Sequence, residues 1–108
     1  MPIYKFQKRN GAIVDFDIQK VEDAIYSALK GIGKDDKITA YTIARDVYAE
    51  AEEAFNDVIP HVEQIQEIVE NMLIKYDYAA AAKAYILYRA KRTEARDGTK
   101  VIVEVEKT

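Results

Sequence analysis

Residues 3–16 read IYKFQKRNGAIVDF, and this stretch decides how the N-terminal part of the chain folds. Both ends of the stretch are rich in β-branched and aromatic residues, which favour strands, and Asn10-Gly11 lies between them. Asn-Gly between two such runs is the strongest short-range signal for a β-hairpin, because both residues of a two-residue turn need positive φ. The sequence therefore predicts a hairpin at about residues 3–16, with Asn10 and Gly11 at its turn.

Four stretches with apolar residues at helical spacing follow the hairpin. Asp17 and Thr39 are the expected N-caps of the first two helices, because short polar side chains can accept from the first free backbone amides. Pro60 disfavours helix for the residue before it and so separates the second helix from the third. The first helix is predicted from Asp17 to the Gly31–Gly33 region and the second from Thr39 to Phe55. The third is predicted from His61 or Val62 to about Tyr76, and the fourth from Ala79 to Asp97-Gly98.

Residues 100–106 alternate between apolar and polar side chains, with Val101, Val103 and Val105 on one face, as in a half-buried strand. A lone hairpin is marginally stable in water, so a third strand would support it. The predicted fold class is α+β, mainly α: a four-helix bundle capped by a small three-stranded β-sheet, made of the N-terminal hairpin and the C-terminal strand. We expect a single domain over residues 1–108.

The composition fits one globular domain, because the chain has 108 residues of which 49% are hydrophobic and 32% charged. It has no cysteine, which excludes disulfides and thiol catalysis, and its single histidine argues against a histidine-based metal site. We therefore expect no metal-ligating residues. The N-terminus has no apolar run typical of a signal peptide, and no stretch is long enough to span a membrane. We expect a cytoplasmic protein without membrane contact.

Basic residues are concentrated towards the two ends of the chain, although the net charge is −3. Residues 35–70 carry ten acids and two bases, whereas residues 71–108 carry eight bases and five acids. This balance is a poor match for a nucleic-acid binder, which needs a broad basic face. A small anion could bind where the two ends of the chain meet. The alternative is a mixed, solvated surface, and the acids of 35–70 are expected on solvated helix faces.

No enzyme motif is present: the sequence has no Gly-rich phosphate loop and no recognisable nucleophile with its base, so we expect no catalytic residues. Lys8 and Arg9 lie at the tip of the predicted hairpin, and Lys20 lies in the first turn of the next helix. A cation in that turn is unfavourable against the helix dipole, unless an anion binds there too. The alternative is that Lys8 and Arg9 only keep the hairpin tip soluble.

Three segments together resemble the ATP-cone domain, which occurs at the N-terminus of many ribonucleotide reductase large subunits and anaerobic reductases. The first holds KRNG at residues 8–11, FD at 16–17 and KV at 20–21. The second is VEQIQEIVE at residues 62–70, and the third is AKAYILYR at residues 82–89. The resemblance covers about residues 3–92. It implies a four-helix bundle under a β-cap, which binds ATP or dATP as an allosteric ligand without catalysis.

The resemblance also implies the residues of the nucleotide site. Basic residues would contact the phosphates, Asp17 would bond a ribose hydroxyl, Val21 and Ile65 would line the adenine slot, and Gln66 would lie at a position that is polar in relatives. Many members have, near the position of His61, a Thr or Ser that caps the third helix and contacts the base. His61 could do either or could simply be exposed, and we favour exposure. The full set of implied binding residues is Lys8, Arg9, Asn10, Gly11, Asp17, Lys20, Val21, Ile65, Gln66, Arg89 and Lys91.

The partners implied by the resemblance are an adenine nucleotide and either a reductase-type catalytic chain or a second copy of this chain. Magnesium could arrive with the nucleotide, held mainly by its phosphates. The alternative function is a structural association module whose nucleotide site has decayed. The two hypotheses differ in one observable, because only a nucleotide-binding chain would gain thermal stability from adenine nucleotides.

Overall fold

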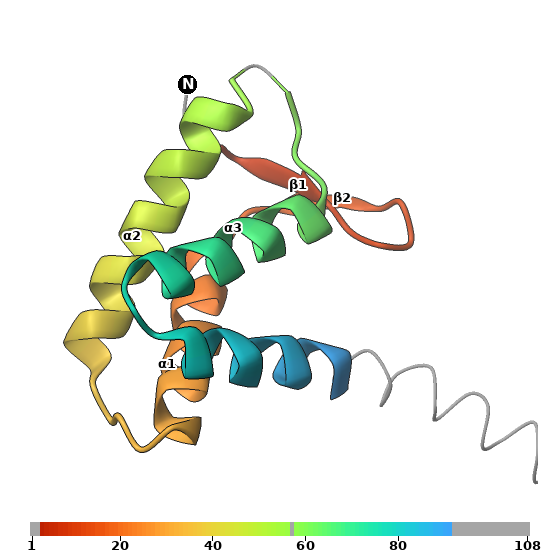
Figure 1. Ribbon diagram of the computed structural model, residues 1–108. Helices are drawn as coiled ribbons and strands as arrows, with labels where there is room; N and C mark the ends of the chain where they lie inside the picture. The colour runs from red at the N-terminus through yellow and green to blue at the C-terminus, as the bar shows by residue number, and fades with distance from the viewer. Residues whose placement is uncertain (1–2, 57, 92–108) are drawn as a thin grey trace, which may run out of the picture.

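The computed structural model of the chain describes residues 3–56 and 58–91 (Figure 1). Its named elements are β1 (Lys5–Gln7), β2 (Ile13–Asp15), α1 (Ile18–Gly31), α2 (Lys37–Ala54) and α3 (Val62–Lys75). A fourth helix follows at residues 79–91. The prediction of a hairpin followed by four helices is confirmed. The described part of the chain holds two strands rather than three, and the predicted strand at residues 100–106 lies outside it.

The two strands form an antiparallel hairpin in which Phe6 lies opposite Val14. Pairing continues one step beyond the strands, where the Lys8 N–H donates to the Ala12 carbonyl at 2.8 Å. The residues left outside this pairing are 9–11, so the loop has three residues.

The turn differs from the predicted one, in which both Asn10 and Gly11 have positive φ. Gly11 alone is left-handed, with φ +88°, and its N–H donates to the Lys8 carbonyl at 2.9 Å. The side chain of Asn10 accepts from the Ala12 N–H at 3.0 Å, so this amide has a partner inside the loop. A three-residue loop that ends in a left-handed glycine is the next most common hairpin connection, and it places Arg9 on the corner of the turn.

The hairpin packs on α2 through its open end, where β1 starts and β2 finishes. Ile3 is buried, and its N–H donates to the Tyr48 hydroxyl at 2.9 Å. Phe16 lies between Phe6 and Tyr48, with ring centroids 6.0 Å and 5.6 Å apart. These contacts join the start of β1 and the end of β2 to one helix, so a two-stranded hairpin gains the apolar support that it lacks alone.

The other end of β1 pairs with the segment that leads into α3. The Gln7 N–H donates to the Pro60 carbonyl at 2.9 Å, and Gln7 forms a parallel β-bridge with His61. The first residue of α3 follows directly, so this contact fixes the hairpin turn beside the N-terminus of α3 (Figure 1).

The N-cap of α1 is the predicted one, but the N-cap of α2 is not. Asp17 accepts from the Gln19 N–H at 3.0 Å, as expected. At α2 the cap is Asp36, which accepts from the Thr39 N–H at 3.0 Å and from its hydroxyl at 2.6 Å. The prediction of Thr39 as cap is wrong because both residues suit the position, and the carboxylate three residues earlier starts the helix one turn sooner.

His61 is the N-cap of α3, and the expectation that it is simply exposed is wrong. Its Nδ1 accepts from the Glu63 N–H at 3.1 Å, and the Gln64 side chain accepts from the His61 N–H at 2.8 Å. This reciprocal arrangement is a capping box, in which an imidazole replaces the usual hydroxyl. It holds the first turn of α3 in place beside the hairpin.

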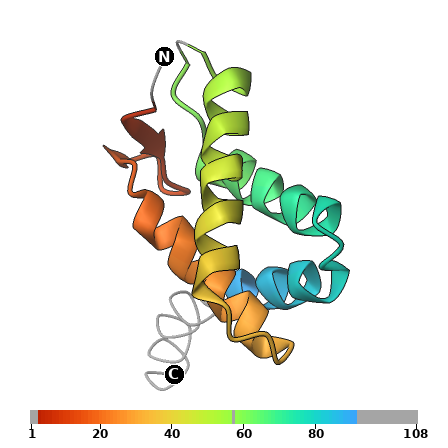
Figure 2. The same cartoon turned by 90° about the vertical axis from the view of Figure 1, so that its left-hand side faces the viewer.

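One apolar core joins the four helices, with Ile25, Leu29, Ile43, Val47 and Leu73 fully buried. α3 and the helix at 79–91 run antiparallel, and α2 crosses them steeply (Figures 1 and 2). The end of the 79–91 helix therefore returns to the start of α3 and the hairpin turn. No helix within the described ranges has the length and apolarity needed to cross a bilayer.

We expect Gly11→Ala to destabilise the protein by about 1–2 kcal/mol, because an L-residue is strained in the left-handed conformation. Gly31→Ala is the matched control, since Gly31 ends α1 without a positive φ and an added Cβ would lie 3.7 Å from Ala84, an ordinary contact. This control should be neutral or slightly stabilising. Urea unfolding of both variants tests the loop geometry, and equal effects would contradict it.

Candidate functional site

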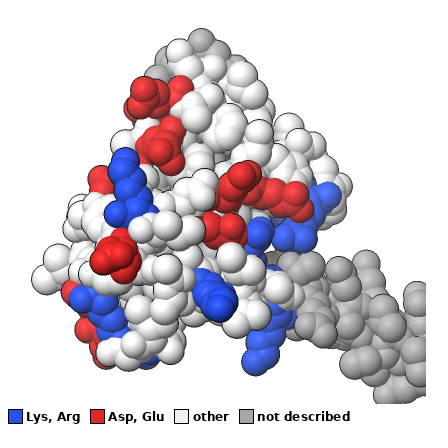
Figure 3. Space-filling model, in the orientation of Figure 1, with Lys and Arg blue, Asp and Glu red and all other residues white. Residues whose placement is uncertain are grey.

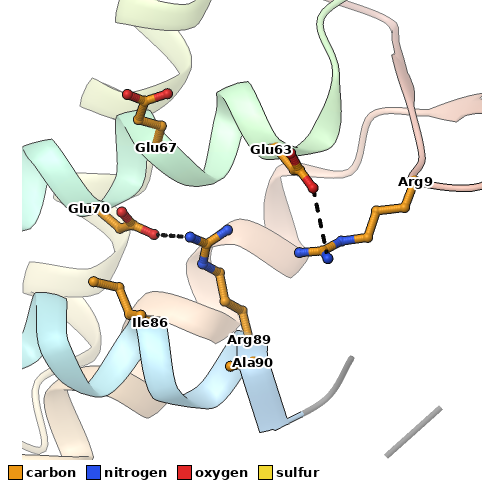
Figure 4. A pocket seen from close by; sticks show the side chains of 7 residues that line it. All are labelled: Arg9, Glu63, Glu67, Glu70, Ile86, Arg89 and Ala90. Carbon is orange, nitrogen blue, oxygen red and sulfur yellow. Dashed lines mark ion pairs between the residues drawn. The ribbon is translucent and has the colours of Figure 1, made fainter. Parts of the chain in front are cut away.

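A hollow of about 650 Å³ opens between α3, the 79–91 helix and the hairpin turn (Figure 4). This volume lies in the range of small-molecule sites. Each of the three elements contributes side chains, and α3 contributes carboxylates only. The lining residues are Arg9, Glu63, Glu67, Glu70, Ile86, Arg89 and Ala90.

The helix geometry explains why these residues meet. Glu63, Glu67 and Glu70 are spaced by four and three residues, so they share one face of α3. Ile86 and Arg89 share a face of the neighbouring helix for the same reason. Because the two helices are antiparallel, a residue near the end of one lies beside the first half of the other (Figure 1).

Arg89 is held firmly by two partners on α3. Its Nη2 lies 2.7 Å from Oε1 of Glu70, and its Nη1 donates to Oε1 of Gln66 at 2.7 Å. The side chains of Arg89 and Glu70 are only 28% and 17% exposed. An ion pair with this little water around it is costly to break from one side, because the remaining charge is left unpaired.

Arg9 is held loosely by comparison. Its Nη1 lies 3.8 Å from Oε1 of Glu63, and the two side chains are 44% and 57% exposed. Figure 4 shows Arg9 reaching from the hairpin turn towards the first turn of α3. Exposed pairs at this distance contribute little to stability, so Arg9 can exchange this partner at small cost.

The hollow is not the purely basic site that the charge distribution suggests. Two guanidinium groups face three carboxylates in its lining, which gives a formal charge of −1. Figure 3 shows acidic and basic side chains meeting on this face of the molecule. The expectation that these acids lie on solvated helix faces is wrong for Glu70, whose side chain is only 17% exposed, whereas Glu63 is exposed as expected. The spacing of the two residues indicates a shared helix face but not the arginines that they meet.

Of the sequence-predicted site residues, Arg9 and Arg89 line the hollow, and Gln66 is bonded to Arg89 without lining it. Three predicted lysines, Lys8, Lys20 and Lys91, do not line it. Lys20 and Lys91 are exposed and Lys8 is half-buried. Within residues 3–56 and 58–91 these three form no ion pair, so their ammonium groups carry uncompensated charge.

Lys20 lies in the first turn of α1, which contains no acidic residue, and Asp17 caps this turn. Its charge therefore adds to the positive end of the helix dipole instead of opposing it. The first turn of α3 differs, because Glu63 lies there and partly neutralises the dipole. Each of these two helix starts therefore has one carboxylate, Asp17 at the cap of α1 and Glu63 in the first turn of α3, and Lys20 adds a cation to the first of them.

The two apolar residues expected at the adenine slot lie in one cluster. Ile65 is 5% exposed and packs with Ile3 and Ala51. Val21 is partly buried and packs against the same cluster. Ile65 is thus mainly a core residue, and Val21 offers more surface to a ligand.

Two further features limit the chemistry of this region. Burial raises the pKa of the Tyr85 hydroxyl above its usual range, so Tyr85 stays neutral near Arg89 and Glu70 at physiological pH. Within the described ranges no three histidine or carboxylate side chains lie close enough together to hold a metal ion. The charged groups available to a ligand are therefore the arginines, the lysines and the α3 carboxylates.

Comparison with known proteins adds independent information. The family model of the ATP cone domain matches residues 4–94. The chain is 35% identical over 92 residues to a vitamin B12-dependent ribonucleoside-diphosphate reductase of Mycobacterium tuberculosis, covering 85% of this chain and 13% of the relative. It is 36% identical over 95 residues to the reductase of the same name from Thermoplasma acidophilum, and the match covers 83% of this chain and 12% of that relative.

A third relative is the anaerobic ribonucleoside-triphosphate reductase of Escherichia coli, which is 36% identical over 90 residues. The match covers 83% of this chain and 12% of that protein. The chain thus spans only 12–13% of the length of these three relatives.

Truncation of the two arginines should have different effects on stability. We expect Arg89→Ala to cost about 1–3 kcal/mol, because Glu70 is left largely buried without its partner. Arg9→Ala should cost less than about 1 kcal/mol. Glu70→Gln added to Arg89→Ala should recover part of the loss, since it removes the unpaired charge. Thermal and urea unfolding measure these differences, and equal losses for both arginines would contradict the assignment.

Proposed function

The chain belongs to the ATP-cone family, and on that premise we propose that it binds ATP or dATP as a regulatory ligand without hydrolysing it. ATP cones are regulatory domains that bind nucleotide effectors. One observation carries the proposal for this chain: arginines from the hairpin turn and from the 79–91 helix converge on one hollow of nucleotide-accommodating size.

The proposed phosphate site lies between the hairpin turn and the start of α1. Lys8 and Arg9 contact the phosphates from the turn, and Asn10 and Gly11 shape this turn, in which the Gly11 N–H donates to the Lys8 carbonyl. Lys20 contacts them from the first turn of α1, where the helix N-terminus adds to the attraction for an anion. Two of these three cations form no ion pair in the described part of the chain, and the third, Arg9, has only a loose one.

The far wall of the proposed site is the end of the 79–91 helix. Lys91 is exposed there and completes the charge around the phosphates. Arg89 donates to the Gln66 side chain at 2.7 Å, and this hydrogen bond holds Gln66 in one orientation. Basic residues from both ends of the chain then serve one anion.

The proposed base contact is apolar. Val21 presents a partly exposed side chain beside the cluster that contains Ile65. Asp17 is the N-cap of α1, and its exposed carboxylate can accept from a ribose hydroxyl. Apolar contact favours a purine, because its larger ring buries more surface than a pyrimidine.

Magnesium enters this account only with the nucleotide. The described residues hold no cluster of three ligating side chains, which supports coordination mainly by phosphate oxygens. No nucleophile or general base beside the cations suggests hydrolysis, and the proposed role is occupancy sensing. Nucleotide binding then favours one association state with a partner over another.

The proposed partner is a reductase-type catalytic chain in the cytoplasm or a second copy of this chain. The relatives are whole reductases, of which this chain matches about one eighth of the length. The second candidate function is an association module without nucleotide binding.

Adenine nucleotide separates the two candidates. We expect saturating ATP or dATP to raise Tm, because a ligand that binds the folded state alone stabilises it, by about 2.7 kcal/mol at one hundred times Kd. CTP should bind more weakly than ATP in calorimetric titration. An unchanged Tm and no saturable heat with ATP would contradict nucleotide binding and favour the association module. Equal affinity for CTP and ATP would show that the protein recognises the phosphates alone.

Lys20→Ala should weaken ATP binding about tenfold to a hundredfold, the value of a charge-assisted contact to phosphate. The loss should be larger for ATP than for AMP. Lys30→Ala is the matched control, an exposed lysine in the last turn of the same helix. It should leave ATP affinity unchanged, and calorimetry measures both.

Two outcomes would contradict the role of Lys20. One is a large drop in Tm without ligand, which would make Lys20 structural. The other is an ATP affinity that Lys20→Ala and Lys30→Ala change equally.

A further inference from the structure

We propose that Glu63 is an internal competitor of the phosphate ligand: it occupies Arg9 in the free protein and so limits the affinity for nucleotide. This inference rests on the proposed function and concerns the regulation of the same site. It starts from the charge of the hollow, in which three carboxylates outnumber two guanidinium groups. A polyanion that approaches this lining meets net repulsion, unless a cation leaves its carboxylate for the ligand.

The two arginines differ in how easily they can leave. Arg89 has partners at 2.7 Å on both Glu70 and Gln66, and its ion pair is largely removed from water. Arg9 has a single carboxylate at 3.8 Å, and both members of the pair are about half exposed. The Arg9–Glu63 contact is therefore the one that opens at small cost when a phosphate arrives.

The backbone prevents Glu63 from simply moving away with Arg9. The His61 side chain accepts from the Glu63 N–H at 3.1 Å, and the start of α3 is tied to β1 by the Gln7–Pro60 hydrogen bond of 2.9 Å. The backbones at Arg9 and Glu63 are thus held near each other, and only their side chains can separate. The Glu63 carboxylate therefore stays within reach of Arg9 and competes with the phosphates for its guanidinium group.

Glu67 provides an internal comparison within the same hollow. It lies one turn further along α3 on the same face, and Figure 4 shows its carboxylate pointing away from both guanidinium groups. It forms no ion pair within residues 3–56 and 58–91. A general charge effect would involve Glu63 and Glu67 alike, whereas competition for Arg9 involves Glu63 alone.

The test is a double-mutant cycle on ATP binding, measured by calorimetry at fixed ionic strength. We expect Glu63→Gln to tighten ATP binding by about two- to fivefold, the size of one exposed ion pair. Glu67→Gln should change it by less than about twofold, because its carboxylate has no contact with Arg9. In the Arg9→Gln background the gain from Glu63→Gln should largely vanish.

A structural role of Glu63 would give a different pattern. Glu63 lies in the first turn of α3, so Glu63→Gln should lower the Tm of the free protein by no more than about 3 °C through the helix dipole. A gain in affinity that persists in the Arg9→Gln background would assign the effect to the dipole and overturn the proposal. ATP binding that Glu63→Gln leaves unchanged, or that Glu67→Gln tightens equally, would also overturn it. Absence of saturable binding to every variant would instead overturn the proposed function, and this inference with it.

Discussion

The hydrogen bond from the Gln7 N–H to the Pro60 carbonyl is the constraint on which the arrangement of the site depends. It joins the hairpin to the segment that caps α3, although these segments are more than fifty residues apart in the sequence. Without it the hairpin turn would have no fixed position over α3. With it, Arg9 on the corner of the turn comes within 3.8 Å of Glu63, and the hollow acquires its third wall.

The second constraint is the antiparallel return of the 79–91 helix along α3, which brings Arg89 to Gln66 and Glu70. The site thus combines a rigid wall, in which the guanidinium group is committed to its partners, with an adjustable one on the hairpin. Such a division suits a sensor, since a fixed frame limits the entropy lost on binding while the loose contact responds to the ligand.

The sequence predicts the order of elements well, because periodicity and turn residues act locally. It predicts three details incorrectly, and each depends on a choice between local alternatives. The loop closes with Gly11 alone in the left-handed region, Asp36 caps α2 in place of Thr39, and His61 caps α3. The carboxylates of the hollow could not be placed from the sequence, because their meeting with Arg9 and Arg89 depends on the packing of two helices and the hairpin.

The central claim is that phosphates bind between the hairpin turn and the first turn of α1, facing the end of the 79–91 helix. Paramagnetic broadening by Mn²⁺–ATP in amide NMR spectra tests it most directly, because broadening falls steeply with distance from the ion held by the phosphates. The account predicts selective loss of the amide signals of residues 8–11 and 18–21, with those of the α1–α2 connection at 33–36 retained. Broadening centred on residues 33–36, or spread evenly over the chain, would contradict it.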